Sequence, residues 1–163
     1  MPIAADHVRI RDPKPADYLA VMSRAVFQAG VSWAQIDRQW SALLAAFERF
    51  EPRRVARYGE KDIVRILDHP GIPHARRKVE ATIRNAKSVL SAESEHGSMR
   101  AYLRSLGRYD AVVADLHERF AYVGDISAYY FLYRVGEPVP PFSTWIKTVK
   151  GEHPRIKEMV GAR

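Results

Sequence analysis

The sequence predicts an all-α fold of roughly eight short helices. Apolar residues recur at three- and four-residue spacing along most of the 163 residues, and no stretch sustains the two-residue alternation of a strand. Hydrophobic residues make up 47% of the chain and charged residues 28%, which is ordinary for a globular protein. The number and shortness of the helices argue against a simple four-helix bundle.

Prolines separate an N-terminal arm from the first helix. Pro13 and Pro15 disfavour helix before residue 16, so we expect an arm over 1–14 and one helical domain over 15–163. Gly30 is a plausible stop for the first helix. The buried face of that helix is predicted from its apolar spacing: Leu19, Met22, Val26 and Phe27.

The second helix begins at a capping box, Ser32 with Gln35 three residues later. Its apolar stripe is formed by Trp33, Ile36, Trp40, Leu43, Leu44 and Phe47. Pro52 begins a short helix, and another is expected over 60–67. Proline and glycine in 69–73 then predict a tight connector.

A long helix is expected over 74–94, with one apolar face and one strongly basic face. Its basic residues are Arg76, Arg77, Lys78, Arg84 and Lys87. Further helices are expected from Ser98, over 109–119, over 125–135 and, after a proline-rich break, over 145–149 and 154–160.

The composition restricts the class of protein. The net charge of +7, from 26 Lys and Arg against 19 Asp and Glu, favours a polyanionic partner such as nucleic acid. The absence of cysteine excludes disulfides, a thiolate metal site and a cysteine nucleophile. No run approaches the roughly 18 apolar residues of a membrane span, and the charged N-terminus does not suit a signal peptide. We therefore expect a cytoplasmic protein, nucleoid-associated if bacterial, with no membrane partner.

Two segments carry more specific motifs. The first reads Gln28-Ala29-Gly30-Val31-Ser32-Trp33, and the second, 120–131, contains Tyr122-Val123-Gly124 ahead of an apolar helix. Between them, Gly71-Ile72 precedes the basic helix. In this order, over about residues 17–135, the chain resembles the 3-methyladenine DNA glycosylase I family of helix-hairpin-helix DNA glycosylases. The resemblance implies that fold, a double-stranded DNA partner and excision of a damaged base.

The resemblance also implies which residues meet the base. Such enzymes flip the damaged base out of the duplex into a pocket, where aromatic faces attract a cationic methylpurine. Trp33 corresponds to the pocket tryptophan of the family. The full set expected at the base is Trp33, Phe27, Gln28, Tyr122 and Tyr129. The alternative for the aromatic members is an ordinary place in the core.

The resemblance places a hairpin at Tyr122-Val123-Gly124. Contacts with the DNA backbone are expected at this hairpin and on basic residues. Free N–H groups at the start of the 125–135 helix favour a phosphate. The expected contacts are Val123, Gly124, Arg76, Arg77, Lys78 and Lys147. The alternatives are a capped helix start, with Asp125 as the cap, and a solvated helix face. No cofactor or metal is implied, and we expect a monomer.

The chain departs from the family at its acidic and metal-binding positions. Ala25 stands where the family has a base-contacting glutamate, and Ser143 stands near the catalytic aspartate of the wider superfamily. The cysteines of the family's zinc site are missing. Asp17 is expected to start the first helix and Asp37 to pair with a neighbouring arginine, which leaves Asp125 as the catalytic candidate.

Three hypotheses remain open. The first is a monofunctional DNA glycosylase that hydrolytically excises an alkylated purine of the 3-methyladenine type. The second is a catalytically inactive relative that recognises bent or damaged duplex DNA. The third is a helical interaction module whose basic surface binds an acidic partner.

Overall fold

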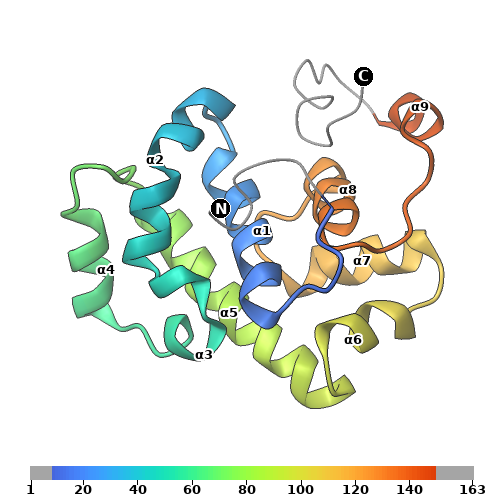
Figure 1. Cartoon of the computed structure of the whole chain (residues 1–163), viewed down its shortest axis with the longest axis horizontal. Helices are drawn as coiled ribbons and strands as arrows, with labels where there is room; N and C mark the ends of the chain where they lie inside the picture. The colour runs from blue at the N-terminus through green and yellow to red at the C-terminus, as the bar shows by residue number, and fades with distance from the viewer. Residues whose placement is uncertain (1–8, 150–163) are drawn as a thin grey trace.

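The computed structural model describes residues 9–149, and every regular element in that range is helical. In chain order these are α1 (Pro15–Gln28), α2 (Trp33–Ala46), η1 (Glu48–Phe50), α3 (Pro52–Val55), α4 (Glu60–Leu67), α5 (Arg76–His96), α6 (Met99–Ser105), α7 (Tyr109–Arg119), α8 (Asp125–Arg134), α9 (Phe142–Trp145) and η2 (Ile146–Thr148) (Figure 1). The all-α prediction is confirmed, with nine α-helices in the described residues where the sequence indicated roughly eight.

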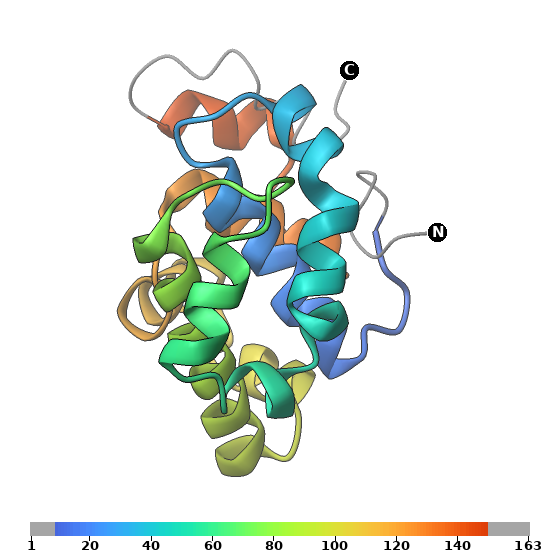
Figure 2. The same ribbon diagram turned by 90° about the vertical axis from the view of Figure 1, so that its left-hand side faces the viewer.

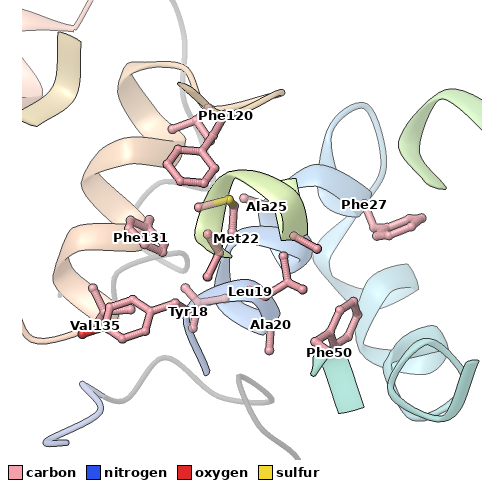
Figure 3. Packing of buried hydrophobic residues seen from close by; sticks show 14 of the residues in the cluster. Tyr18, Leu19, Ala20, Met22, Ala25, Phe27, Phe50, Phe120, Phe131 and Val135 are labelled. Atoms are coloured by element: carbon pink, nitrogen blue, oxygen red, sulfur yellow. The ribbon is translucent and has the colours of Figure 1, made fainter. Parts of the chain in front are cut away.

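Helix α1 is the central helix of the fold (Figure 1; Figure 2). All ten residues from Tyr18 to Phe27 are buried, including the charged Arg24. A helix covered on all sides must be surrounded by other elements, and α1 packs against α5, α8, α2 and η1. Figure 3 shows Tyr18 on the side of Phe131 in α8, with Phe27 extending to the opposite side near Phe50. The core therefore lies on both sides of α1.

An aromatic cluster joins α1 and α2 to the short helices that follow. Phe47 is fully buried, and its ring centroid lies 5.2 Å from that of Phe50 and 6.1 Å from that of Tyr58. Phe27 approaches Phe47 at 5.8 Å, and Trp40 stacks on Phe50 at 5.3 Å. We call these five side chains the Phe47 cluster.

The predicted starts of the first two helices are confirmed by their hydrogen bonds. The Gln35 N–H donates to Ser32 Oγ at 3.1 Å, so Ser32 caps α2. The Lys14 N–H donates to Asp17 Oδ2 at 2.8 Å, which places the Asp17 carboxylate in the first turn of α1. A carboxylate there is favourable because the helix N-terminus carries partial positive charge.

Helix α5 is the longest described helix, with 21 residues. Val79 and Ala86 are buried, whereas Arg84 and Lys87 are exposed, as the amphipathic pattern predicted. The helix packs against α1, α3, α4 and α6. Within residues 9–149, neither α5 nor any other helix has the length and apolar character needed to cross a membrane.

The differences from the predicted helices lie at element ends. Helix α5 begins and ends two residues later than predicted, because Gly97, with a φ of +90°, supplies its stop. The C-terminal helical segment begins at Phe142 rather than 145. The helix predicted over 154–160 lies outside the described residues, as does 1–8 of the arm. The boundary between arm and domain stays a prediction.

Candidate functional site

The connection between α7 and α8, residues 120–124, is held in place by α5. Phe120 and Val123 are buried. The buried side chain of Asn85 accepts a hydrogen bond from the Ala121 N–H at 2.8 Å and donates one to the Ala121 carbonyl oxygen at 3.2 Å. This pair of bonds fixes the hairpin relative to the core. The sequence analysis did not predict this role of Asn85. An amide side chain on the buried face of a helix is the pattern that would have indicated it.

The start of α8 presents main-chain N–H groups at an accessible surface. Gly124 precedes the helix and is exposed, and a Cβ placed on it would meet no atom within 4 Å. The helix N-terminus can therefore be approached closely by an anion. Asp125 does not cap it, because its Oδ1 lies 3.0 Å from His117 Nε2. The Asp125 side chain is 70% exposed.

Tyr122 projects outward from the hairpin. Its side chain is 42% exposed, and its φ of +64° is uncommon for a residue other than glycine. It lines an open hollow of about 390 Å³ together with Tyr58 and the α5 residues Arg77 and Arg84. The remaining lining residues are Ile63, Glu80 and Ile83. Tyr122 thus lies beside the basic face of α5.

Trp33 begins α2 and lies against side chains from two other helices. Its ring centroid is 5.7 Å from that of Tyr130 in α8. The guanidinium of Arg24 in α1 lies over its face at 4.9 Å and over Trp40 at 5.2 Å. Arg24 also forms an ion pair with Asp37 of α2. Trp33 itself is 5% exposed. We call these five side chains the Trp33 cluster: Trp33, Trp40, Tyr130, Arg24 and Asp37.

Tyr130 of the Trp33 cluster is hydrogen-bonded to a second buried arginine, Arg134. Burial raises the pKa of Tyr130, so its phenol is neutral at physiological pH. The hydroxyl accepts a hydrogen bond from Arg134 Nη1 at 2.9 Å. Arg134 and Arg24 are each 1% exposed. The Asp37 carboxylate, which pairs with Arg24, is 56% exposed.

Two other residues predicted at the base lie near the end of α1. The ring of Phe27 is fully buried and packs on Phe47. Gln28 Nε2 donates to the Val31 carbonyl oxygen at 3.3 Å, within the turn from α1 to α2. Phe27 therefore contributes to the core, and the Gln28 side chain is bonded within the turn that precedes Trp33. Any contact of either residue with a base stays a prediction.

Tyr129 is directed away from its neighbour Tyr130. Its ring stacks on Trp145 at 4.0 Å, and its hydroxyl donates to the Pro140 carbonyl oxygen at 2.8 Å. Adjacent residues on a helix point about 100° apart. Because of this rotation, Tyr130 is the α8 tyrosine that meets Trp33, and the sequence pattern alone did not distinguish the two.

The basic residues expected at the DNA backbone have different surroundings. Arg76 Nη1 lies 3.0 Å from Glu60 Oε2 in an exposed ion pair. Arg77 is exposed on α5 at the hollow beside Tyr122. Lys147 is exposed in η2, at the end of the described residues. Of the three α5 residues predicted at the DNA backbone, Arg77 is the one that lines the hollow beside Tyr122.

Lys78 instead closes the end of α1. Its Nζ donates to the carbonyl oxygens of Phe27 at 3.1 Å and Ala29 at 2.6 Å. Burial of the ammonium lowers the pKa of Lys78. A cation at a helix C-terminus satisfies carbonyl groups that have no partner within the helix. The half-buried ammonium is thus already engaged, which favours a structural role.

Replacing Lys78 with methionine is expected to lower the free energy of unfolding by about 2 kcal/mol, because hydrogen bonds from a charged donor contribute roughly 1.5–3 kcal/mol. Urea unfolding measures the change. Lys87→Met, an exposed position on the same helix, should shift stability by less than about 0.5 kcal/mol. If the Lys78 variant keeps its stability but binds DNA more weakly, the structural role is wrong and Lys78 contacts the DNA backbone as the sequence predicted.

The described structure places few acidic groups near Trp33. Ala25 is 3% exposed within α1 and contributes no carboxylate, and Ser143 is exposed in α9. Asp37 pairs with an arginine, as predicted, but that arginine is the buried Arg24. In the sequence, Arg24 could have been noticed as a charged residue inside the apolar run 19–27. No three potential metal ligands gather within residues 9–149.

Comparison with known proteins places this arrangement among DNA glycosylases. A model described as methyladenine glycosylase matches residues 15–119. A DNA-3-methyladenine glycosylase from Haemophilus influenzae is 23% identical over 130 residues, which cover 67% of this chain and 70% of that protein.

Solved structures share the fold. 3-Methyladenine DNA glycosylase I from Staphylococcus aureus superposes with a TM-score of 0.70 at 27% identity, over 81% of this chain and 82% of that one. A variant of 3-methyladenine DNA glycosylase I in complex with 3-methyladenine gives a TM-score of 0.69 at 27% identity, over 80% of this chain and 82% of the other. The fold expected from the sequence motifs is confirmed.

Proposed function

The chain belongs to the methyladenine glycosylase family, and from this premise we propose that it excises an alkylated purine of the 3-methyladenine type from double-stranded DNA. The reaction is hydrolysis of the N-glycosidic bond, in which water adds to C1′ of the deoxyribose, the base leaves and one proton is released. A cationic methylpurine is a good leaving group, so strong acid catalysis is less necessary. The shared fold of a solved complex with 3-methyladenine supports this proposal most directly.

In the proposed complex the DNA strand docks at the start of α8. The exposed N–H groups beyond Gly124 bind a phosphate, and Arg77 neutralises a neighbouring one. Asn85 supports this contact by holding the hairpin. The exposure of Asp125 and its pairing with His117 favour a place at the edge of the DNA contact over one at the reacting base.

The flipped base is proposed to stack at Trp33. Tyr130 supports the indole from α8, and Tyr122 stands at the hairpin, where it can contact the duplex. The hairpin 120–124 contains no lysine that could form a Schiff base with the sugar. The expected products are therefore a free base and an abasic site, without strand cleavage.

Base release from methylated duplex DNA tests the proposal. The native chain should release 3-methyladenine, measured by mass spectrometry. Trp33→Ala should slow release by about tenfold, because base–aromatic stacking contributes roughly 1–3 kcal/mol. Trp145→Ala removes another buried indole, one that stacks on Tyr129, and should leave base release by the folded protein unchanged. DNA binding without base release by the native chain would reject the enzyme hypothesis.

A catalytically inactive, DNA-binding relative is the second candidate. Ala25 and Ser143 favour it, because neither can supply a carboxylate to stabilise a developing cation. This function requires salt-sensitive binding to bent or damaged duplex with no abasic product. Base release that appears only in Ala25→Glu would support it, whereas release by the native chain would exclude it.

A further inference from the structure

The open hollow beside the hairpin combines apolar, aromatic and charged side chains. Its volume of about 390 Å³ lies within the roughly 300–1,000 Å³ of small-ligand sites. Ile63 of α4 and Ile83 of α5, at 8% and 6% exposure, give it an apolar base. Tyr122 of the hairpin and the α5 residues Arg77 and Arg84 surround that base. Such a lining suits a ligand with one flat apolar group and one negative charge.

The ring of Tyr122 is available to a ligand. Within residues 9–149 it stacks on no other ring, and its hydroxyl has no hydrogen-bond partner. Tyr58, the other aromatic residue of the hollow, is already engaged: its ring stacks on Phe47, and its hydroxyl donates to Glu48 Oε2 at 2.7 Å. Tyr122 is therefore the aromatic side chain of the hollow on which a flat group can stack.

The arginines of the hollow are also available. Arg77 and Arg84 are exposed, and neither pairs with a carboxylate in the described part of the chain, whereas Arg76 beside them pairs with Glu60. Glu80 lies between the two arginines on the same face of α5 and lines the hollow without an ion pair to either. Two arginines against one glutamate leave one net positive charge, which matches a single phosphodiester group.

Aromatic rings beside basic residues are the means by which proteins bind unpaired nucleic acid, since the cations hold the backbone and each ring stacks on a base. We propose that the hollow binds one unpaired nucleotide of the damaged strand, with its base on Tyr122 and its phosphate at Arg77 and Arg84. This inference rests on the proposed function, because the strand docked beyond Gly124 supplies the nucleotide. Trp33 does not line the hollow, so this nucleotide is a neighbour of the flipped one.

The test compares duplexes that differ only in which strand keeps a base. Each carries a tetrahydrofuran abasic analogue at the lesion position, which sets where the protein binds. A second analogue at a neighbouring position lies either in the complementary strand, which leaves the damaged-strand base unpaired, or in the damaged strand, which removes that base. At one such position the native chain should bind the first duplex about tenfold more tightly than the second, the effect of stacking one base on an aromatic ring.

Variants at position 122 separate the ring from the backbone. Tyr122→Asn should bind both duplexes equally, because it removes the ring while asparagine tolerates the φ of +64° at this position. Tyr122→Phe should keep the tenfold preference, because stacking needs the ring and not the hydroxyl.

The charged positions are expected to act on the phosphate, which both duplexes retain. Arg77→Met and Arg84→Met should weaken binding of both duplexes and each lower the slope of log K against log salt by about 0.9. Glu80→Gln should strengthen both by about threefold, the size of one exposed charge–charge interaction. Arg108→Met removes an exposed cation outside the hollow and should change neither the slope nor the preference.

A preference near tenfold that Tyr122→Asn abolishes supports the inference. Equal binding of the paired duplexes at every position, or a preference that survives in Tyr122→Asn, overturns it. Release of 3-methyladenine by the same preparation would then leave the proposed function standing. Failure to bind any of these duplexes also overturns the inference, and absence of base release besides would overturn the proposed function with it.

Discussion

Phe47→Ala is expected to lower the free energy of unfolding by about 4 kcal/mol, within the range of roughly 3–5 kcal/mol for truncation of a buried phenylalanine. The ring is fully buried and contacts Phe27, Phe50 and Tyr58. Its removal loses apolar burial and leaves a cavity between α1 and η1. Because 1 kcal/mol shifts Tm by about 2–4 °C in a domain of this size, Tm should fall by roughly 10 °C.

Circular dichroism melting, checked by urea unfolding, measures this loss. Val64→Ala is the matched truncation of an exposed apolar residue, since Val64 is 44% exposed, and should change stability by no more than about 0.5 kcal/mol. A loss below about 1 kcal/mol for the phenylalanine variant would mean that the Phe47 cluster collapses to fill the space. The cluster would then contribute little to stability.

Alkaline pH is expected to unfold the protein cooperatively. Burial raises the pKa of six tyrosines: Tyr18, Tyr58, Tyr102, Tyr109, Tyr129 and Tyr130. In the unfolded chain tyrosine ionises near pH 10, while the folded protein retains these protons. The stabilisation is therefore complete below about pH 10 and is lost as the pH rises toward the folded pKa values.

The size of the alkaline effect follows from the most deeply buried phenols. Four tyrosines are at most 3% exposed: Tyr18, Tyr102, Tyr129 and Tyr130. A phenol that stays protonated in the folded state costs up to about 1.4 kcal/mol of stability per pH unit above 10, so several of them together remove a large share of the stability of the fold. A domain has only about 5–15 kcal/mol of stability in total.

Urea unfolding at pH 8, 9, 10 and 11, with phenolate absorbance followed in parallel, measures the slope. Tyr102→Phe should make it shallower by the share of one tyrosine, because burial and the hydrogen bond to Asp115 both raise the pKa of this phenol. In the native structure Asp115 is also paired with Arg119, whose Nε lies 3.4 Å from Asp115 Oδ2. The carboxylate therefore has a second partner besides the phenol hydroxyl that this variant removes. Constant stability between pH 9 and 11 would show that the phenols ionise within the folded state.

The helices were predictable because local signals and burial agree. The apolar spacing of α1, the glycine that follows it at position 30 and the serine cap of α2 all act within one or two turns, and tertiary packing did not override them. Element ends were less certain, as Gly97 shows, because a helix continues until a residue can adopt the turn that stops it.

The site was only partly predictable, because it depends on how helices cross. The sequence analysis expected Trp33 and Tyr129 at one pocket, whereas the α8 ring beside Trp33 is that of Tyr130, a choice set by the rotation of α8 about its axis. In the sequence Lys78 cannot be distinguished from the neighbouring surface cations, because its hydrogen bonds to the end of α1 are tertiary contacts. Arg24 carried a signal, a charge inside an apolar run, but its contact with Trp33 is tertiary.

The two hydrogen bonds from Asn85 to the hairpin are both made to the main chain of Ala121. The side chain at 121 can therefore change without loss of these two hydrogen bonds, whereas aspartate at position 85 would lack the amide donor. The same property makes this junction suitable for protein engineering: other tight turns could be grafted there, provided that they offer one peptide group to the amide.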